Sequence, residues 1–161
     1  MTKNAANNRK KRVRTDDDFD DMNWHGCRIY AVAFYPETFE LAFDIDYVFS
    51  TEKDETQFRF WVSPATLVFS NVRDLELSIS SWNGGLEISS ISRTAIGKPI
   101  NHEYIKRDIE WLWLMECEEG EIILKSVGFN QYIRRQAILT EIPSLLPEER
   151  GIASFSRQFE S

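Results

Sequence analysis

The sequence has few of the residues on which disulfide-rich and membrane-spanning proteins depend. Its 161 residues include two cysteines, Cys27 and Cys117, and two histidines. Two cysteines cannot build the disulfide framework of a small secreted domain, and this usage indicates a reducing, cytoplasmic location. No apolar run approaches the ~20 residues that a membrane-spanning helix needs, and no apolar segment follows the basic N-terminal residues as it does in a secretory signal. We therefore expect a cytoplasmic protein without a membrane partner.

The motifs of common enzymes are also missing from the sequence. It contains no glycine-rich phosphate loop, no Gly-x-Ser-x-Gly elbow and no His-Glu-x-x-His pair. His25 and Cys27 would lie side by side on a strand, but nothing near them indicates the lowered pKa that a nucleophilic thiol requires. We therefore interpret Cys27 as structural. The sequence predicts no catalytic residue, no metal ligand set and no cofactor, and we expect the protein not to be an enzyme.

Positive charge is scarce beyond the first 14 residues. Six of the 19 basic residues and none of the 26 acidic ones lie in this N-terminal segment: Lys3, Arg9, Lys10, Lys11, Arg12 and Arg14. Residues 15–161 then carry 13 basic and 26 acidic side chains, a net charge of −13. An acidic body repels phosphate backbones and attracts cationic partners, so we expect no nucleic-acid binding through the main domain. Residues 1–21 are charged and lack a hydrophobic period, which predicts a flexible tail.

From residue 22 onward the hydrophobic residues mostly alternate, as is typical of strands. The clearest case is 40–50, where apolar residues at odd positions alternate with a second set that includes Asp44 and Asp46. We expect a break or a sheet edge at Pro64 and a tight hairpin at Asn83-Gly84. Further strands are expected over 28–35, 57–62, 65–69, 75–80, 86–91, 109–115 and 121–127. Residues 128–136 are expected to form either another strand or an irregular continuation.

The spacing of these segments predicts an all-β fold with little helix. Short strands joined by turns favour a single-domain antiparallel sandwich or strongly curled sheet of about eight or nine strands. The β domain is expected to span residues 22–139. Residues 140–161 form an irregular C-terminal extension in this prediction, with at most a short helical turn at 147–152.

Asp44 and Asp46 are the first candidate site, because residues two apart on a strand point the same way. Paired carboxylates can bind a divalent cation or share a proton, and His25 would be a third ligand if it came near. The alternative is a solvated strand face, or carboxylates paired with arginines of neighbouring strands, such as Arg28 or Arg59. We favour the alternative, because a metal site needs ligands that the sequence does not place.

A second candidate combines acidic and aromatic residues near predicted turns. Glu116, Glu118, Glu119 and Glu121 surround Gly120 without the spacing of a calcium loop, which indicates a solvated hairpin tip. Trp24 and Trp82 lie where a strand begins and at a turn, so we expect both to be partly exposed. Exposed aromatic rings beside acidic groups are typical of protein-binding hot spots. The candidate binding residues are Asp44, Asp46, Trp82, Glu118 and Glu119.

Three segments carry a family resemblance: Met22–Ile29 (MNWHGCRI), Phe43–Phe49 (FDIDYVF) and Phe60–Phe69 (FWVSPATLVF). Together they resemble a group of small uncharacterised bacterial β-rich proteins, some of which look like immunity proteins of toxin systems. The likeness covers about residues 20–137 and rests on the general residue pattern of the predicted strands rather than on a catalytic motif. It implies a single β domain in a bacterial cytoplasm and transfers no catalytic residue.

Three hypotheses about function stay open at this point. The leading one is a non-enzymatic protein-binding module for another protein, such as a basic nuclease toxin. The second is a small-ligand- or metal-binding protein, including an enzyme, that uses Asp44 and Asp46. The third is a structural homo-oligomer, because strand edges in an all-β chain pair readily with a second copy.

Overall fold

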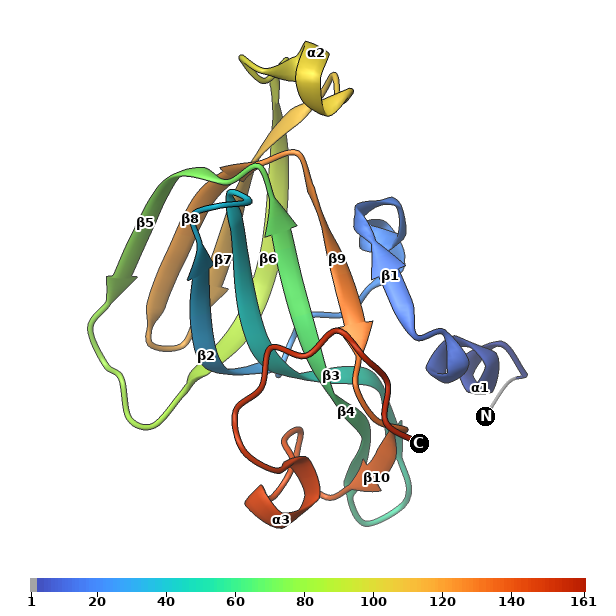
Figure 1. Ribbon diagram of the computed structural model, residues 1–161. Coiled ribbons are helices and arrows are strands. Elements are labelled where there is room, and N and C mark those ends of the chain that lie inside the picture. The colour runs from blue at the N-terminus through green and yellow to red at the C-terminus, as the bar shows by residue number, and fades with distance from the viewer. Residues whose placement is uncertain (1–2) are drawn as a thin grey trace.

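Ten strands form one antiparallel sheet in the computed structural model, which describes residues 3–161 (Figure 1). The strands are β1 (Val13–Thr15), β2 (Arg28–Tyr35), β3 (Glu40–Lys53), β4 (Phe58–Ser70), β5 (Arg73–Ile79), β6 (Leu86–Gly97), β7 (Glu110–Cys117), β8 (Gly120–Ser126), β9 (Gly128–Ile133) and β10 (Ile138–Thr140). Their order in the sheet is β1-β9-β4-β3-β2-β6-β7-β8-β5, and β10 pairs with β4. The antiparallel all-β prediction is confirmed, with ten strands in place of eight or nine.

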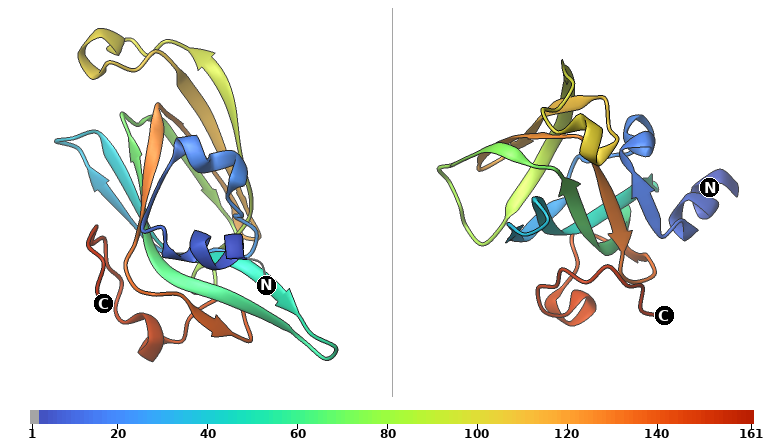
Figure 2. Two further views of the ribbon diagram at one scale, coloured as in Figure 1. Left: turned by 90° about the vertical axis from the view of Figure 1, so that its right-hand side faces the viewer. Right: turned by 45° about the horizontal axis from the view of Figure 1, so that its top comes forward.

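The sheet bends so strongly that its two halves enclose a core between them (Figure 2). The half β1-β9-β4-β3-β2 is joined to the half β6-β7-β8-β5 through a short pairing of β2 with β6, where Ile29 lies opposite Leu86. Rings from the two halves meet, and the centroids of Phe69 and Trp113 are 5.3 Å apart. The sheet ends at β1 and β5, which do not pair with each other, so it is curled but not closed into a barrel.

Trp113 lies at the centre of the core. Its side chain is fully buried, and ring centroids of Phe19 and Phe129 lie 5.2 Å and 5.6 Å from its own. The indole Nε1 donates a hydrogen bond to the carbonyl oxygen of Ser126 at 3.1 Å, so the polar end of the ring is satisfied as well. Trp24 also packs here and is only 5% exposed, so the expectation that it is partly exposed is wrong.

The N-terminal segment belongs to the fold from residue 3 onward, which corrects the prediction of a flexible tail over 1–21. It consists of α1 (Lys3–Lys10), β1 and the 3-10 helix η1 (Asp16–Asp21), and β1 pairs with β9. Figure 2 shows this segment crossing the open side of the curled sheet. Phe19 packs on the core, and the Asp16 carboxylate accepts a hydrogen bond from the Phe129 amide at 3.3 Å. Residues 1 and 2 of the predicted tail lie outside the described residues.

The predicted break at Pro64 is absent, because β4 runs through this residue. Residues 60–62 of β4 pair with β10 and residues 65–70 pair with β9. Pro64 therefore lies where the neighbouring strand changes and no N–H donor is needed. Its carbonyl oxygen accepts a hydrogen bond from the Arg134 amide at 2.9 Å.

The predicted tight hairpin at Asn83-Gly84 is wrong. Strand β5 pairs with β8, where Leu77 lies opposite Ile122, and β6 pairs with β7. The loop over residues 80–85 therefore crosses from one edge of this half of the sheet to a strand three places away. An Asn-Gly pair supplies a turn, but the burial of the flanking strands decides which strands pair.

Helices contribute little to the fold, as the sequence predicts. Helix α1 has 8 residues, and α2 (His102–Ile105) and α3 (Pro147–Arg150) have 4 each. The short helical turn expected at 147–152 is confirmed by α3. Within residues 3–161, no helix combines the length and the apolar character that crossing a membrane requires.

Gly120 provides a test of the turn between β7 and β8. Its φ of 150° is unfavourable for other residues, and a Cβ atom there would overlap the carbonyl oxygen of Ser78. We expect Gly120→Ala to lower the free energy of unfolding by more than ~1 kcal/mol in urea titrations. Gly84→Ala is the control, because Gly84 also has a positive φ of 91° but has no atom within 4 Å of the added Cβ. Equal losses in both variants would show that the contact with Ser78 is unimportant.

Candidate functional site

Asp44 and Asp46 share one face of β3, but that face is not exposed. Both residues are 0% exposed, so the expectation of a solvated, partner-accessible pair is wrong. The covering segment is residues 144–161, which we call the C-terminal strap; Figure 1 shows it running across β3 and β4. The strap corresponds to most of the extension predicted at 140–161. It is irregular apart from α3, and it completes the fold.

Two buried arginines neutralise this carboxylate pair. Arg134 Nη2 lies 2.6 Å from Asp44 Oδ1, and Arg150 Nη2 lies 2.8 Å from the same oxygen. Arg150 also reaches Asp46, with Nε 3.2 Å from Oδ1. The arginines are only 5% and 6% exposed, so these ion pairs are screened little by solvent. The predicted pairing with arginines is therefore realised, but by the residue after β9 and by α3.

The two arginines named from the sequence have other partners. Arg59 lies at the surface, with Nε 3.9 Å from an Asp54 carboxylate oxygen. Arg28 is opposite Asp46 in the strand register, yet its guanidinium lies over the Tyr30 ring at 5.7 Å. Neither therefore makes the ion pair expected of it.

Backbone and hydroxyl donors complete the cluster around the two carboxylates. Asp46 Oδ2 accepts hydrogen bonds from Tyr30 Oη at 2.7 Å and from the Leu145 amide at 2.8 Å. Asp44 Oδ2 accepts one from the Ser154 amide at 3.1 Å. Burial raises the pKa of Asp46, and the contacts from Leu145, Tyr30 and Arg150 oppose that rise. Leu145, Arg150 and Ser154 therefore hold the strap against the two aspartates of β3.

The arrangement does not supply the third ligand on which the metal hypothesis depends. His25 lies against β6, with Nδ1 3.3 Å from the carbonyl oxygen of Ser89. Among residues 3–161, no group of three or more His, Cys, Asp or Glu side chains is placed to hold a metal ion. Each carboxylate oxygen of Asp44 and Asp46 instead accepts from a donor of the protein.

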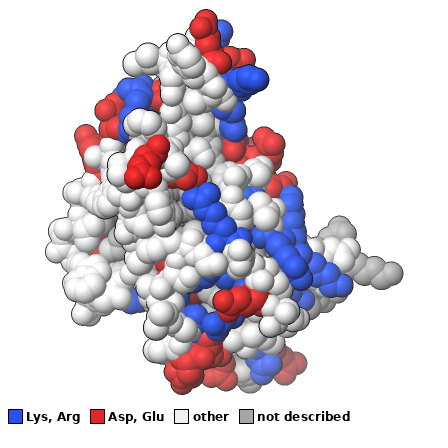
Figure 3. All heavy atoms as spheres, in the orientation of Figure 1, with Lys and Arg blue, Asp and Glu red and all other residues white. Residues whose placement is uncertain are grey.

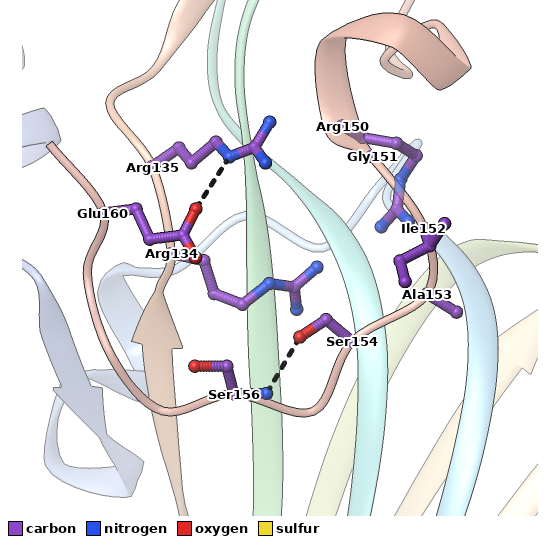
Figure 4. Close-up of a pocket in the computed structure, with 9 residues that line it drawn as sticks. All are labelled: Arg134, Arg135, Arg150, Gly151, Ile152, Ala153, Ser154, Ser156 and Glu160. Carbon is purple, nitrogen blue, oxygen red and sulfur yellow. Dashed lines mark hydrogen bonds and ion pairs between the residues drawn. The ribbon is translucent and has the colours of Figure 1, made fainter.

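Beside the cluster, the strap lines a cavity of about 280 Å³ that is open to solvent. Figure 4 shows its lining: Arg134 and Arg135 on one side, Arg150 and the strap residues 151–154 on the other, with Ser156 and Glu160 below and beside them. The Arg135 Nε lies 3.5 Å from the Glu160 carboxylate. Three guanidinium groups therefore lie around one small space.

The other candidate residues come together at one end of the half-sheet β6-β7-β8-β5. The loop that carries Trp82 lies beside the β7–β8 turn, because the amides of Ser80 and Ser81 donate to the Glu119 carbonyl at 2.9 Å and 3.4 Å. Trp82 is 67% exposed, which confirms the exposure expected for it. We call this region the acidic end and define it by Trp82, Glu116, Glu118, Glu119 and Glu121.

The carboxylates of the acidic end lie close enough to repel one another. Glu116 and Glu121 are directly opposite across β7 and β8, a pairing of like charges that destabilises a sheet. Glu118 is exposed, whereas Glu119 is half-buried because its Oε1 accepts from the Glu87 amide at 2.8 Å. Burial, together with the charges of Glu119 and Glu118, raises the pKa of Cys117 to about 11.

Cys27 is placed as a structural residue. It is fully buried, its Sγ lies 3.7 Å from the Asn23 carbonyl oxygen, and it accepts from the Val48 amide at 3.4 Å. Burial raises the pKa of its thiol to about 12, the opposite of the change that activates a cysteine nucleophile.

Sequence reasoning missed Arg134, Arg150 and Tyr30 as partners of the aspartates. One signal was present: Ala42 and Val48 flank Asp44 and Asp46 on the same face of the strand, and both are 1% exposed. An apolar residue on each side of a carboxylate pair indicates a covered face. Comparison of the chain with known proteins matched no family model, no curated protein and no solved structure.

Proposed function

We propose that the protein is a non-enzymatic binding module that engages a basic partner protein through its acidic end. The observation that carries this proposal is the placement of the exposed Trp82 beside the Glu118–Glu119 turn. A large exposed indole supplies the apolar anchor of a protein interface, and the surrounding carboxylates supply charge complementarity to lysine and arginine.

Charge supports the same partner class. The chain from residue 15 to 161 has a net charge of −13, and four glutamates lie within six residues at the acidic end. Glu116 and Glu121 face each other there, and neither is in an ion pair within residues 3–161, an arrangement that a bound cationic surface would relieve. The resemblance to immunity-like bacterial proteins suggests the partner: a basic toxin, such as a nuclease, met in the cytoplasm.

Affinity capture from a native lysate, followed by titration of the purified captured protein, tests this proposal. The test variant is Trp82→Ala/Glu118→Gln/Glu121→Gln. The matched control is Tyr104→Ala/Glu103→Gln/Glu55→Gln, which removes another exposed ring, 89% exposed, and two other exposed carboxylates. We expect a basic protein to be captured at low salt. Its affinity for the test variant should be at least ~10-fold lower than for the wild type, and its affinity for the control should be within ~2-fold of the wild type.

Two outcomes would contradict the proposal. The first is equal affinity of the test variant and the wild type, which would remove the acidic end from the interface. The second is an affinity that does not fall as salt is added, because the association rate of two oppositely charged surfaces decreases as ionic strength rises.

A further inference from the structure

The cavity under the C-terminal strap, which the proposed function does not use, has more hydrogen-bond donors than acceptors. Arg134 has five N–H groups, of which Nη1 donates to Thr66 at 2.9 Å and Nη2 to Asp44 at 2.6 Å. Its three other N–H groups have no acceptor among the described residues, although its side chain is only 7% exposed. A donor-rich, nearly buried guanidinium calls for an acceptor-rich ligand.

Two serines of the strap add to this surplus. The Oγ of Ser154 accepts from the Ser156 amide at 3.1 Å, and the Oγ of Ser156 accepts from the Gln158 amide at 3.2 Å. Each hydroxyl proton is then free to donate, and both serines line the cavity. Figure 4 shows the Arg134 guanidinium pointing toward Ser154 and Ser156.

The charges identify Arg135 as the group that a ligand would engage. Arg134 and Arg150 are balanced by Asp44 and Asp46, whereas Glu160 is the one carboxylate paired with Arg135 among the described residues. Arg135 Nη1 also donates a hydrogen bond to the Glu149 carbonyl oxygen at 3.0 Å. The Arg135–Glu160 pair is weak: the atoms are 3.5 Å apart, longer than the ~2.8 Å of a charge-assisted hydrogen bond, and Glu160 is 70% exposed. Removing the Glu160 carboxylate from the site leaves one uncompensated positive charge.

Basic side chains also lie beside the strap. Figure 3 shows Lys and Arg side chains gathered on the face that carries it, with Asp and Glu side chains among and below them. Arg12 lies over the Phe159 ring at 3.8 Å, and Arg157, which is paired with Glu40 at 3.1 Å, lies over the Tyr132 ring at 5.7 Å. Positive charge around the mouth of a cavity raises the local concentration of anions.

We propose that this cavity is a binding site for the oxyanion group of a small ligand, a phosphate or a carboxylate. Arg135, Arg134 and the hydroxyls of Ser154 and Ser156 are the donors. In the free protein the Glu160 carboxylate occupies the ligand's position beside Arg135 and leaves when the ligand binds. The volume of about 280 Å³ is close to the lower limit of ~300 Å³ for small-molecule sites, so the ligand has a small body.

Calorimetric titration of the whole chain with sodium phosphate, sodium acetate and, at matched ionic strength, sodium chloride tests the proposal. We expect an oxyanion to bind more tightly than chloride. Glu160→Gln removes the competing carboxylate and is expected to tighten binding about fivefold, whereas Arg135→Gln weakens it by at least ~10-fold. The matched controls are Glu76→Gln and Arg59→Gln, which change the same charges at exposed positions that do not line the cavity, and both should bind as the wild type does.

Each outcome of the titrations supports or contradicts the proposed oxyanion site. Tighter binding of phosphate than of acetate identifies a phosphate ligand, and the reverse order identifies a carboxylate. Binding no stronger than that of chloride, for the wild type and for Glu160→Gln, overturns the site. Unchanged affinity in Arg135→Gln overturns the assignment of Arg135, and weaker binding in Glu160→Gln overturns the competition. A far-ultraviolet circular dichroism spectrum checks that each variant is folded.

Discussion

Replacing Asp44 with asparagine is expected to lower the free energy of unfolding by about 3–5 kcal/mol, the usual effect of removing one partner from a buried ion pair. Asp44 is 0% exposed and accepts from Arg134, Arg150 and the Ser154 amide. In the variant, the guanidinium groups of Arg134 and Arg150 stay buried, and the Asp46 carboxylate is the one negative charge left in the cluster. Urea unfolding followed by circular dichroism measures the loss.

The control for this prediction is Glu40→Gln. The Glu40 carboxylate also pairs with a strap arginine, at 3.1 Å from Arg157 Nη2, but that arginine side chain is 41% exposed. We expect a change of about 0–1 kcal/mol there, because solvent competes for both groups. If the two variants lose equal stability, burial of the Asp44 cluster is not what holds the strap. Should Asp44→Asn fail to fold at all, Tyr30→Phe, which removes only the hydroxyl hydrogen bond to Asp46 from the cluster, gives a milder test.

Replacing Trp113 with alanine is expected to lower the free energy of unfolding by about 3–5 kcal/mol as well, for a different reason. The indole is fully buried, and its ring packs against Phe19, Phe69 and Phe129 at centroid distances of 5.2 to 5.6 Å. Its removal leaves a cavity between the halves of the sheet and removes the indole hydrogen bond to the Ser126 carbonyl oxygen. Urea unfolding again measures the effect.

Trp82→Ala is the matched control for Trp113, because it makes the same chemical change at a ring that is 67% exposed. We expect its stability to stay within about 0.5 kcal/mol of the wild type. A loss at Trp82 as large as at Trp113 would mean that the loop over residues 80–85 is packed more tightly than its exposure indicates.

The parts of the fold that depend on local pattern could be predicted from the sequence. The strand expected over residues 28–35 has the observed bounds of β2, and the alternation in 40–50 lies within β3. The glutamates of the acidic end could be predicted too, since Glu116, Glu118, Glu119 and Glu121 are neighbours in sequence, but the contact of their turn with the loop that carries Trp82 could not. Alternation and turn composition are properties of short segments, and they carry over directly into strands and turns.

The parts that depend on long-range contacts could not be predicted. The pairing of β5 with β8 joins residues 41 to 52 positions apart, from Ile79 with Gly120 to Arg73 with Lys125, whereas Asn83-Gly84 is only a local signal. The cluster at Asp44 joins residues 90 to 110 positions apart, and no periodicity within one segment reports such a contact. The N-terminal segment lacks a hydrophobic period because Phe19 is its main contact with the core.

The strap also has a consequence for how the chain folds during synthesis. The donors to Asp44 follow it by 90, 106 and 110 residues, so a growing chain displays two carboxylates on an otherwise apolar strand face until those residues are made. Neighbouring strands such as β2, β3 and β4 can pair early, because their connections are short. Closing the loop from β3 to the strap is slower, since its entropy loss grows with length. Strap residues translated 106 and 110 residues after Asp44 therefore complete the layer over β3. Until then, the surplus of negative charge on the unfinished sheet opposes its association with other copies.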